Sequence, residues 1–404
     1  MRIGVPTEVK SQESRVAITQ AGVHHLAQRG HDVLIQAGAG VNSGISDGEY
    51  AAAGATILPT AGDVWGSSEL LIKVKEPIAS EYQFLRPDLV LFTYLHLAAD
   101  KPQTEALVNS GTTSIAYETV QTADGALPLL RPMSEVAGRL AALVGTEALM
   151  KHHGGEGILI PGVPGVAPAK VLVIGAGNAG QNATQMAVGL RANVTVFDVN
   201  TSRLVAVDTE FGGRVTTMMS TAWAIEQAVR DADLVIGTVL VPGARAPKVV
   251  TNAMVASAKP GSVFVDVAVD QGGCFEDTHA TTHADPTFKV HQSYFYCVAN
   301  MPGAVPVTST HALTNATLPY ITKLADLGWR DALRSDPALA KGLSTTGGML
   351  TSEPVAAAWG HEFTSPSHVL TALGIGCARW RARGPLGESA HLPATGSRPS
   401  WRSP

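Results

Sequence analysis

Several features that define large classes of proteins are scarce in this 404-residue sequence. Cysteine occurs only three times, which excludes a disulfide framework, and no two cysteines have the spacing of a metal knuckle. No apolar run reaches about 18 residues, so no membrane-spanning helix is expected. Pro6 and Glu8 interrupt the amino-terminal stretch, which therefore does not resemble a secretory signal. These absences favour a cytoplasmic protein without a membrane partner.

Charge is also scarce, at 16% of residues, and the net charge of −5 argues against general binding of nucleic acid. Hydrophobic residues make up 45%, which excludes disorder throughout the chain. Residues 372–404 contain five arginines and one glutamate together with many Gly, Pro and Ser residues. We therefore expect a basic, disordered tail after a more acidic folded part. The length indicates two or three domains, at about 100–200 residues each.

Short apolar segments alternate with helical patterns along most of the chain, which is typical of a parallel α/β fold. In the first part, strands are predicted at 2–5, 32–35, 69–74, 88–94 and 113–117, and helices at 19–29, 78–85 and 102–109. An apolar stripe from Met133 to Val144 predicts a long helix. Further strands are predicted at 171–174, 194–197, 214–218, 234–236, 263–267 and 294–298, with helices at 222–230, 310–324 and 336–341. Six strands between about 170 and 298 indicate a doubly wound dinucleotide-binding fold.

A glycine motif, Gly-Ala-Gly-Asn-Ala-Gly at 175–180, lies between a predicted strand and a predicted helix. Gly175 permits a tight turn, Gly177 lets a pyrophosphate approach the backbone, and Gly180 lets helix and strand pack closely. The next strand ends at Asp198, whose carboxylate suits the ribose hydroxyls of NAD and repels the 2′-phosphate of NADP. Arg203 stands close enough in sequence to receive such a phosphate. The alternative is a structural glycine turn without a ligand.

Polar side chains follow several of the predicted strands, where ligands of α/β proteins bind. Lys75, His96 and Asp270 each stand at such a position, and Arg15 stands early in the chain. A pair of cations such as Arg15 and Lys75 suits a carboxylate substrate, and a histidine exchanges protons near neutral pH. The alternative for each residue is a solvated or capping role at the end of a strand.

Seven segments together closely resemble NAD-dependent alanine dehydrogenases, a family that also includes the NAD-binding subunit of proton-pumping transhydrogenase. These segments are 1–18, 73–77, 93–97, 133–141, 173–180, 266–275 and 297–302, and the likeness covers about residues 1–370. The resemblance implies reversible oxidative deamination of L-alanine to pyruvate and ammonium, with NAD as hydride acceptor. It leaves two alternatives open, a transhydrogenase-like subunit and a catalytically silent NAD-binding regulator.

The resemblance also implies roles for individual residues. Arg15 and Lys75 would bind the substrate, His96 would be the general acid and base, and Asp270 would orient the amine or water. Tyr94 and Met133 would form pocket walls. Residues expected at the NAD site are Ser134, Gly175, Gly177, Asn178, Ala179, Gly180, Asp198, Arg203, Ser220, Val239, Leu240, Val267, Ala268, Val269, Asp270, Val298, Ala299, Asn300 and Met301.

The same resemblance implies an α/β protein of two domains. A Rossmann NAD domain at 129–305 would be inserted into a Rossmann-like catalytic domain formed by 1–128 and 306–371. A homohexamer is expected, with small-molecule substrates as its other partners.

No metal is predicted. Some relatives hold a divalent ion with a glutamate and a histidine. Glu118 stands at the first of these positions, but Leu327 occupies the second. His279, His283 and His291 lie in a segment rich in turn-forming residues, so we expect solvated loop histidines there rather than a metal cluster.

We predict that the protein binds NADH in preference to NADPH, because the Asp198 carboxylate repels a 2′-phosphate. The Asp198→Arg variant is expected to shift this preference toward NADPH. Titration of both dinucleotides by the change in their fluorescence measures the two affinities. Preference for NADPH in the unmodified protein would contradict the assignment of Asp198.

Overall fold

A computed structural model describes residues 1–239 and 246–371 of the chain. Its strands form two sheets, each built mainly from parallel strands. Leu240, expected at the NAD site, lies outside the described residues, as do Cys377 and the predicted tail 372–404. No helix within the described ranges is long and apolar enough to cross a membrane.

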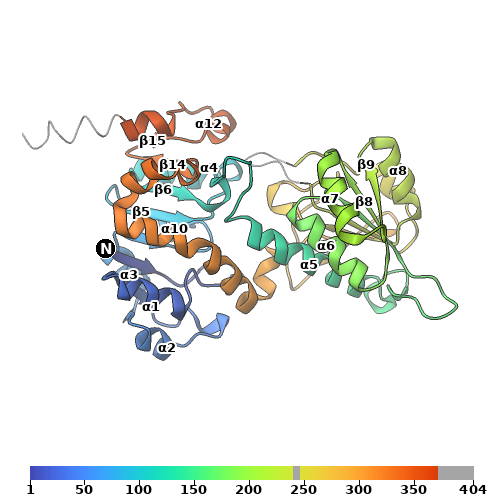
Figure 1. The fold of residues 1–404 in the computed structure, drawn as a ribbon, viewed down its shortest axis with the longest axis horizontal. Helices are drawn as coiled ribbons and strands as arrows, with labels where there is room; N and C mark the ends of the chain where they lie inside the picture. The colour runs from blue at the N-terminus through green and yellow to red at the C-terminus, as the bar shows by residue number, and fades with distance from the viewer. Residues whose placement is uncertain (240–245, 372–404) are drawn as a thin grey trace, which may run out of the picture. The chain divides into compact units, whose positions relative to one another are not determined.

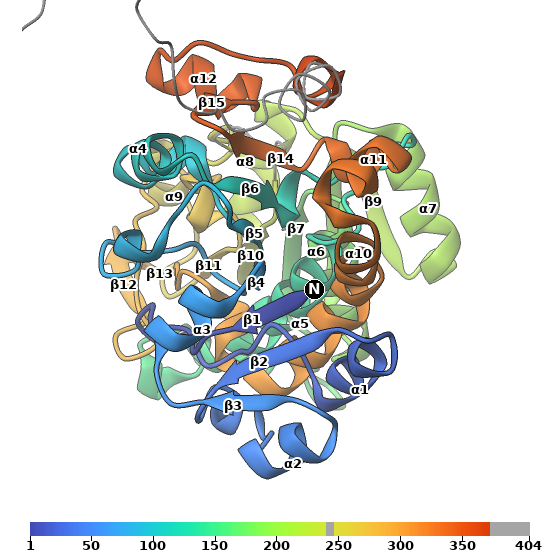
Figure 2. The ribbon, with the colours of Figure 1, turned by 90° about the vertical axis from the view of Figure 1, so that its left-hand side faces the viewer.

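The first sheet has, within these ranges, eight strands in the order β15-β14-β6-β5-β4-β1-β2-β3. Strands β1 to β6 are parallel, whereas β14 pairs antiparallel with β6 and β15 with β14. Figure 2 shows α1 and α10 on one side of this sheet and α3 and α4 on the other. The strands are β1 (Arg2–Val5), β2 (Asp32–Gln36), β3 (Thr56–Leu58), β4 (Leu70–Ile72), β5 (Val90–Thr93), β6 (Thr113–Ala116), β14 (Leu343–Thr346) and β15 (Met349–Leu350). The helices are α1 (Gln20–Gln28), α2 (Asp47–Ala52), α3 (Ala61–Ser67), α4 (Lys101–Ser110), α10 (Pro306–Ser335), α11 (Pro337–Ala340) and α12 (Glu353–Trp359).

The second sheet has seven described strands in the order β12-β13-β11-β10-β7-β8-β9. All neighbours are parallel except β12 and β13, so six strands follow the order of a doubly wound dinucleotide fold. The strands are β7 (Lys170–Ile174), β8 (Asn193–Asp198), β9 (Val215–Met219), β10 (Leu234–Gly237), β11 (Val263–Asp266), β12 (Thr287–Val290) and β13 (Ser293–Tyr296). Figure 1 shows α6 and α7 beside them; the helices are α5 (Arg131–Ala148), α6 (Asn178–Gly189), α7 (Thr201–Phe211), α8 (Ala222–Asp231) and α9 (Asn252–Ala256).

The chain leaves the first sheet after β6 and returns to it through β14. Hydrogen bonds between hydroxyl groups join β14 to β6: Ser114 bonds Thr345 at 2.7 Å, and Thr113 bonds Thr346 at 2.9 Å. The second sheet is therefore inserted between two parts of the first. The expected architecture, an α/β protein of two domains with one inserted into the other, is confirmed.

Most predicted elements are present with small changes at their ends, but the helix predicted at 78–85 is wrong. Only a 3-10 turn, Tyr82–Phe84, forms there. The reason lies in Glu81, whose carboxylate accepts the Ile78 N–H at 3.1 Å and contacts buried Lys73 at 2.8 Å. This folding back of a polar side chain, after the break at Pro77, replaces helical hydrogen bonding.

The glycine turn after β7 depends on the absence of side chains. A Cβ on Gly180 would overlap the Gly175 carbonyl oxygen, whereas a Cβ on Gly189, in the same helix α6, would meet no atom within 4 Å. The absence of a side chain at Gly180 therefore lets the start of α6 pack against the turn. No close contact requires a glycine at position 189.

We predict opposite effects of alanine at these two glycines. Gly180→Ala is expected to lower stability by about 1–3 kcal/mol because the turn must open to admit the methyl group. Gly189→Ala is expected to raise it by about 0.4–1 kcal/mol, since alanine restricts the unfolded chain. Thermal unfolding of both variants beside the unmodified protein measures the effects. Equal shifts in the same direction would contradict the packing described.

Candidate active site

The turn after β7 has the geometry that a pyrophosphate requires. Gly175 adopts φ = 104°, and a Cβ there would lie 2.7 Å from the Thr238 hydroxyl oxygen. A Cβ on Gly177 would meet nothing within 4 Å, so the backbone is open at that residue. Helix α6 begins at Asn178 and directs its first N–H groups toward this open side. The turn is therefore suited to an anion at the helix N-terminus.

Asp198, at the end of β8, lies against this turn and is 5% exposed. One carboxylate oxygen accepts the Ala176 N–H at 2.6 Å, and the other accepts the Asn200 N–H at 2.7 Å. Arg203 contacts the same carboxylate at 3.7 Å. Each oxygen keeps a further lone pair, so Asp198 can also accept hydrogen bonds from ribose hydroxyls. The residues of this turn fit a dinucleotide such as NAD.

The remaining residues expected at the NAD site mostly follow strands of the second sheet. Ser220 follows β9, Val239 follows β10, the stretch 267–270 follows β11, and 298–301 follows β13. Because these strands are parallel to β7, their carboxyl ends share one edge with the glycine turn. Ser134 lies instead on α5, which packs closely on α6 where Gly138 meets Ala179. The topology brings the residues that follow β9, β10, β11 and β13 to one edge from four separate connections.

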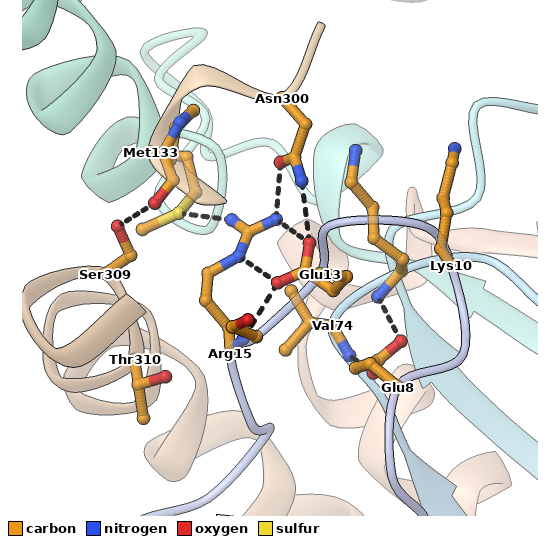
Figure 3. A network of polar contacts seen from close by, with 12 residues as sticks. Glu8, Lys10, Glu13, Arg15, Val74, Met133, Asn300, Ser309 and Thr310 are labelled. Atoms are coloured by element: carbon orange, nitrogen blue, oxygen red, sulfur yellow. Dashed lines mark hydrogen bonds and ion pairs between the residues drawn. The ribbon is translucent and has the colours of Figure 1, made fainter. Parts of the chain in front are cut away.

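Arg15 is almost fully buried and already paired. Its Nε donates to Glu13 at 2.7 Å and its Nη2 donates to Glu13 at 2.5 Å and to the Asn300 side-chain oxygen at 2.6 Å, as Figure 3 shows. Its Nη1 lies 3.0 Å from the sulfur of Met133. Burial raises the pKa of Glu13, but the hydrogen bonds and charge of Arg15 and the hydrogen bond from Asn300 outweigh this effect, so the pKa falls to about 2. Glu13 is therefore a charged counter-ion, and Nη1 is the less engaged end of the guanidinium.

Asn300, which we expected only at the NAD site, connects two groups of residues. Its side-chain nitrogen donates to Glu13 at 2.8 Å, and its backbone N–H donates to Asp270 at 3.2 Å. It has a left-handed backbone, with φ = 58°. Asp270 lies in the 3-10 turn Val269–Gln271 and is exposed. A chain of hydrogen bonds thus runs from Arg15 through Asn300 to Asp270.

Lys75 follows β4 and is 6% exposed. Within residues 1–239 and 246–371, its Nζ makes no hydrogen bond or ion pair, although its backbone N–H points to Glu8. It differs in this from buried Arg15 and Lys73, which are both paired with carboxylates. Among the residues that the structure describes, the Lys75 ammonium group therefore has no partner and is available to interact with a ligand.

His96 follows β5 in a left-handed conformation, with φ = 51°. Its backbone N–H donates to Glu118 at 2.7 Å, its Nδ1 lies 3.8 Å from Glu76, and its ring stacks on Tyr94 with centroids 5.9 Å apart. Burial lowers the pKa of His96, but the carboxylates of Glu118 and Glu76 raise it more, so the net shift is upward. The ring is half-buried and suited to hold and release a proton.

Three glutamates, Glu8, Glu13 and Glu76, are the residues that the sequence analysis missed. Burial raises the pKa of Glu76, yet His96, Lys75 and Lys10 lower it far more, so Glu76 stays ionised. Glu8, Glu13 and Glu76 each face a buried cation or the histidine. The usable signal was electrostatic: a buried cation needs a counter-charge, and Glu13 and Glu76 stand two residues from Arg15 and next to Lys75 in the sequence.

The glutamate and the histidines considered for metal binding make other contacts. Glu118 gives its carboxylate to the backbone N–H groups of Leu95 and His96, and Leu327 is half exposed. His279 packs on the ring of Phe288, the His283 backbone N–H donates to the side-chain oxygen of Gln12, and the His291 ring bonds Asn252. No group of three metal-binding side chains occurs in the described part of the chain.

Two family models match the chain in succession. The alanine dehydrogenase/PNT N-terminal domain matches residues 4–137, and the alanine dehydrogenase/PNT C-terminal domain matches residues 141–353. The second match spans the nucleotide-binding sheet and continues into the return to the first sheet.

Similar proteins carry related names. The chain is 64% identical over 370 residues to alanine dehydrogenase of Mycolicibacterium smegmatis, covering 92% of this chain and 100% of that protein. It is 52% identical to alanine dehydrogenase of Geobacillus stearothermophilus, with the same coverage. A solved L-alanine dehydrogenase aligns with a TM-score of 0.85 at 49% identity, covering 89% of this chain and 99% of that one. A transhydrogenase from Sinorhizobium meliloti aligns with a TM-score of 0.73 at 25% identity, covering 87% and 99%.

We predict that Glu76→Gln lowers the pKa of His96, because it removes a negative charge that favours the imidazolium form. NMR titration of the His96 ring in the unmodified protein and the variant measures the shift. Glu105→Gln, which neutralises an exposed carboxylate near Lys101, is the matched control and is expected to leave the titration unchanged. Superimposable curves for Glu76→Gln and the unmodified protein would show that Glu76 does not act on His96.

Proposed function

The chain belongs to the alanine dehydrogenase/PNT family, and on that premise we propose that it catalyses the reversible, NAD-dependent oxidative deamination of L-alanine to pyruvate and ammonium. The observation that carries this function is the cluster of unpaired Lys75, half-buried His96 and paired Arg15 beside residues of the nucleotide-binding sheet. Gly175 and Gly177 would hold the pyrophosphate of NAD and Asp198 its ribose hydroxyls, and the bound NAD would supply the hydride acceptor.

The substrate carboxylate binds to Arg15 and Lys75 in this proposal. Glu13 and Asn300 occupy Nε and Nη2 of Arg15, so Nη1 is the nitrogen that meets the substrate. The Lys75 ammonium polarises the carbonyl of pyruvate in the direction of amination. Glu13 neutralises Arg15, whereas the Lys75 ammonium group makes no ion pair among the described residues.

His96 moves the protons that the reaction requires. The α-amine of alanine must lose a proton before Cα can release a hydride, and water must then add to the imine to give a carbinolamine, which collapses to pyruvate and ammonia. His96 accepts and returns these protons, while Glu76 and Glu118 stabilise its charged form. Asp270, bonded to the Asn300 backbone, orients the amine or the attacking water.

We propose the domain limits that the resemblance implies, with 129–305 binding NAD and with 1–128 and 306–371 binding substrate. Support comes from strand membership, since β7 to β13 form one sheet and β1 to β6 with β14 and β15 form the other. We also propose a homohexamer in the cytoplasm. The buried, free thiols of Cys274 and Cys297 suit a reducing compartment.

Two other functions remain distinguishable by experiment. A transhydrogenase-like subunit, suggested by the structural match at 25% identity, would bind NAD without oxidising alanine. A silent NAD-binding regulator would bind NADH and turn over neither alanine, pyruvate nor glyoxylate. The identity of 64% to an alanine dehydrogenase favours the dehydrogenase.

We predict that the unmodified protein forms NADH from alanine plus NAD and consumes it with pyruvate plus ammonium. His96→Ala is expected to lower kcat by about 10²–10⁴-fold, because the proton shuttle is lost, while NADH still binds. Absorbance of NADH measures turnover, and fluorescence titration measures binding. His24→Ala, at an exposed histidine of α1, is the control. Near-normal kcat in His96→Ala would refute the role of His96.

A further inference from the structure

Two lysines flank Val74 after the end of β4, and their surroundings differ completely. Lys73 is 1% exposed, and its Nζ lies 3.2 Å from Glu8 and 2.8 Å from Glu81. Lys75 keeps an ammonium group without a partner in the described residues. Lys73 is thus saturated by carboxylates and has nothing left for a ligand. Its position within two residues of Lys75 points to a supporting role.

Glu8 binds three successive residues of this segment. Its carboxylate accepts the Val74 N–H at 2.6 Å and the Lys75 N–H at 3.4 Å while it pairs with the Lys73 ammonium. Figure 3 shows the carboxylate of Glu8 beside Val74. A single carboxylate therefore accepts the backbone N–H groups of both Val74 and Lys75.

The end of β1 explains why a carboxylate is needed there. Strand β1 pairs with β4 up to Gly4 and Leu71, and it ends at Val5, before Pro6. Beyond that point β4 has lost its neighbour on this side, while on the other side the chain still bonds β5, since Lys73 N–H donates to Phe92. Glu8, three residues beyond β1, replaces the missing backbone acceptors with its two oxygens.

Glu81 closes the other end of the segment. It pairs with Lys73 through one oxygen and accepts the Ile78 N–H through the other. The residues between these two anchors include Lys75 and Glu76, which are the cation and the histidine partner of the proposed site. Two buried carboxylates around one lysine are costly to desolvate, so stability alone does not explain them. Burial raises the pKa of Glu8 against the opposing effect of Lys73, which reflects that cost.

We propose that Glu8 is a positioning residue, anchored on Lys73, that fixes where the Lys75 ammonium stands in the site. The proposal rests on the proposed function, because Lys75 matters only if it binds substrate. Glu8 itself does not touch substrate. Its effect passes through the peptide N–H groups of Val74 and Lys75, so it disappears once the Lys75 side chain is removed.

A double-mutant cycle of Glu8→Gln and Lys75→Ala tests this coupling. Glu8→Gln is expected to lower kcat/KM for pyruvate by about 10–100-fold, as a misplaced binding group does, and to leave NADH affinity unchanged. In the Lys75→Ala background the same change is expected to cost less than about twofold, because interacting residues are not additive. Equal losses in both backgrounds would overturn the proposal and assign Glu8 to the fold alone.

Three further measurements keep the result decisive. Glu69→Gln removes an exposed carboxylate that also accepts a backbone N–H, from Arg2 at 2.8 Å, and is expected to leave kcat/KM unchanged. If Glu8→Gln does not fold, Glu8→Asp retains the charge beside Lys73 but withdraws it from Val74 and is expected to show the same coupling. Binding of pyruvate to the protein–NADH complex, measured calorimetrically, gives the cycle a readout without turnover.

Failure of the proposed function can be told apart from failure of this proposal. If the unmodified protein binds pyruvate but does not convert it, the proposed function is refuted, while the Glu8 cycle can still be measured by binding.

Discussion

Residues far apart in the chain gather at one edge of each sheet because both sheets are built mainly from parallel strands, whose carboxyl ends share an edge. In the second sheet this edge collects the glycine turn after β7 and Asp198 after β8. In the first it collects Lys75 after β4 and His96 after β5. Parallel pairing requires crossover connections, and these bring loops that are far apart in the sequence side by side at the same edge. Each chemical group of the site depends on this alignment.

Ion pairs between buried side chains fix the orientation of the charged groups in these loops. Arg15 and Lys73 are both almost fully buried, and each has a carboxylate at 3.2 Å or less. Such pairs are costly to desolvate. Their contribution is to hold the partner side chains in one orientation. Lys75, left without a partner among the described residues, stands out against this background. Glu13 and Asn300 likewise orient Arg15 so that one end of its guanidinium stays available.

Much of the fold could be predicted from the sequence because the signals are local. Strands such as β7 and β11 are short apolar runs buried on both faces, and α1 is capped by Thr19, where the helix predicted at 19–29 begins. Other elements carry no such signal. Strand β14 reads Leu-Ser-Thr-Thr, and its hydroxyl groups become suitable for a buried strand only because β6 offers matching hydroxyl groups. The turn at Tyr82–Phe84 forms where a helix was expected because Glu81 bonds to Lys73.

The same division holds for the site. The amino-acid sequence by itself determined the chemistry: a glycine turn followed by Asp198, and cations and a histidine at strand ends, in a chain that resembles alanine dehydrogenases. Only the tertiary structure decided which of these groups are free. It pairs Arg15 with Glu13 and Lys73 with Glu8, leaves the Lys75 ammonium group without a partner among the described residues, and brings Asn300, which follows a strand of the second sheet, into hydrogen-bond contact with Arg15. The physical reason is that counter-charges are set by proximity and burial, which the order of residues along a chain does not specify.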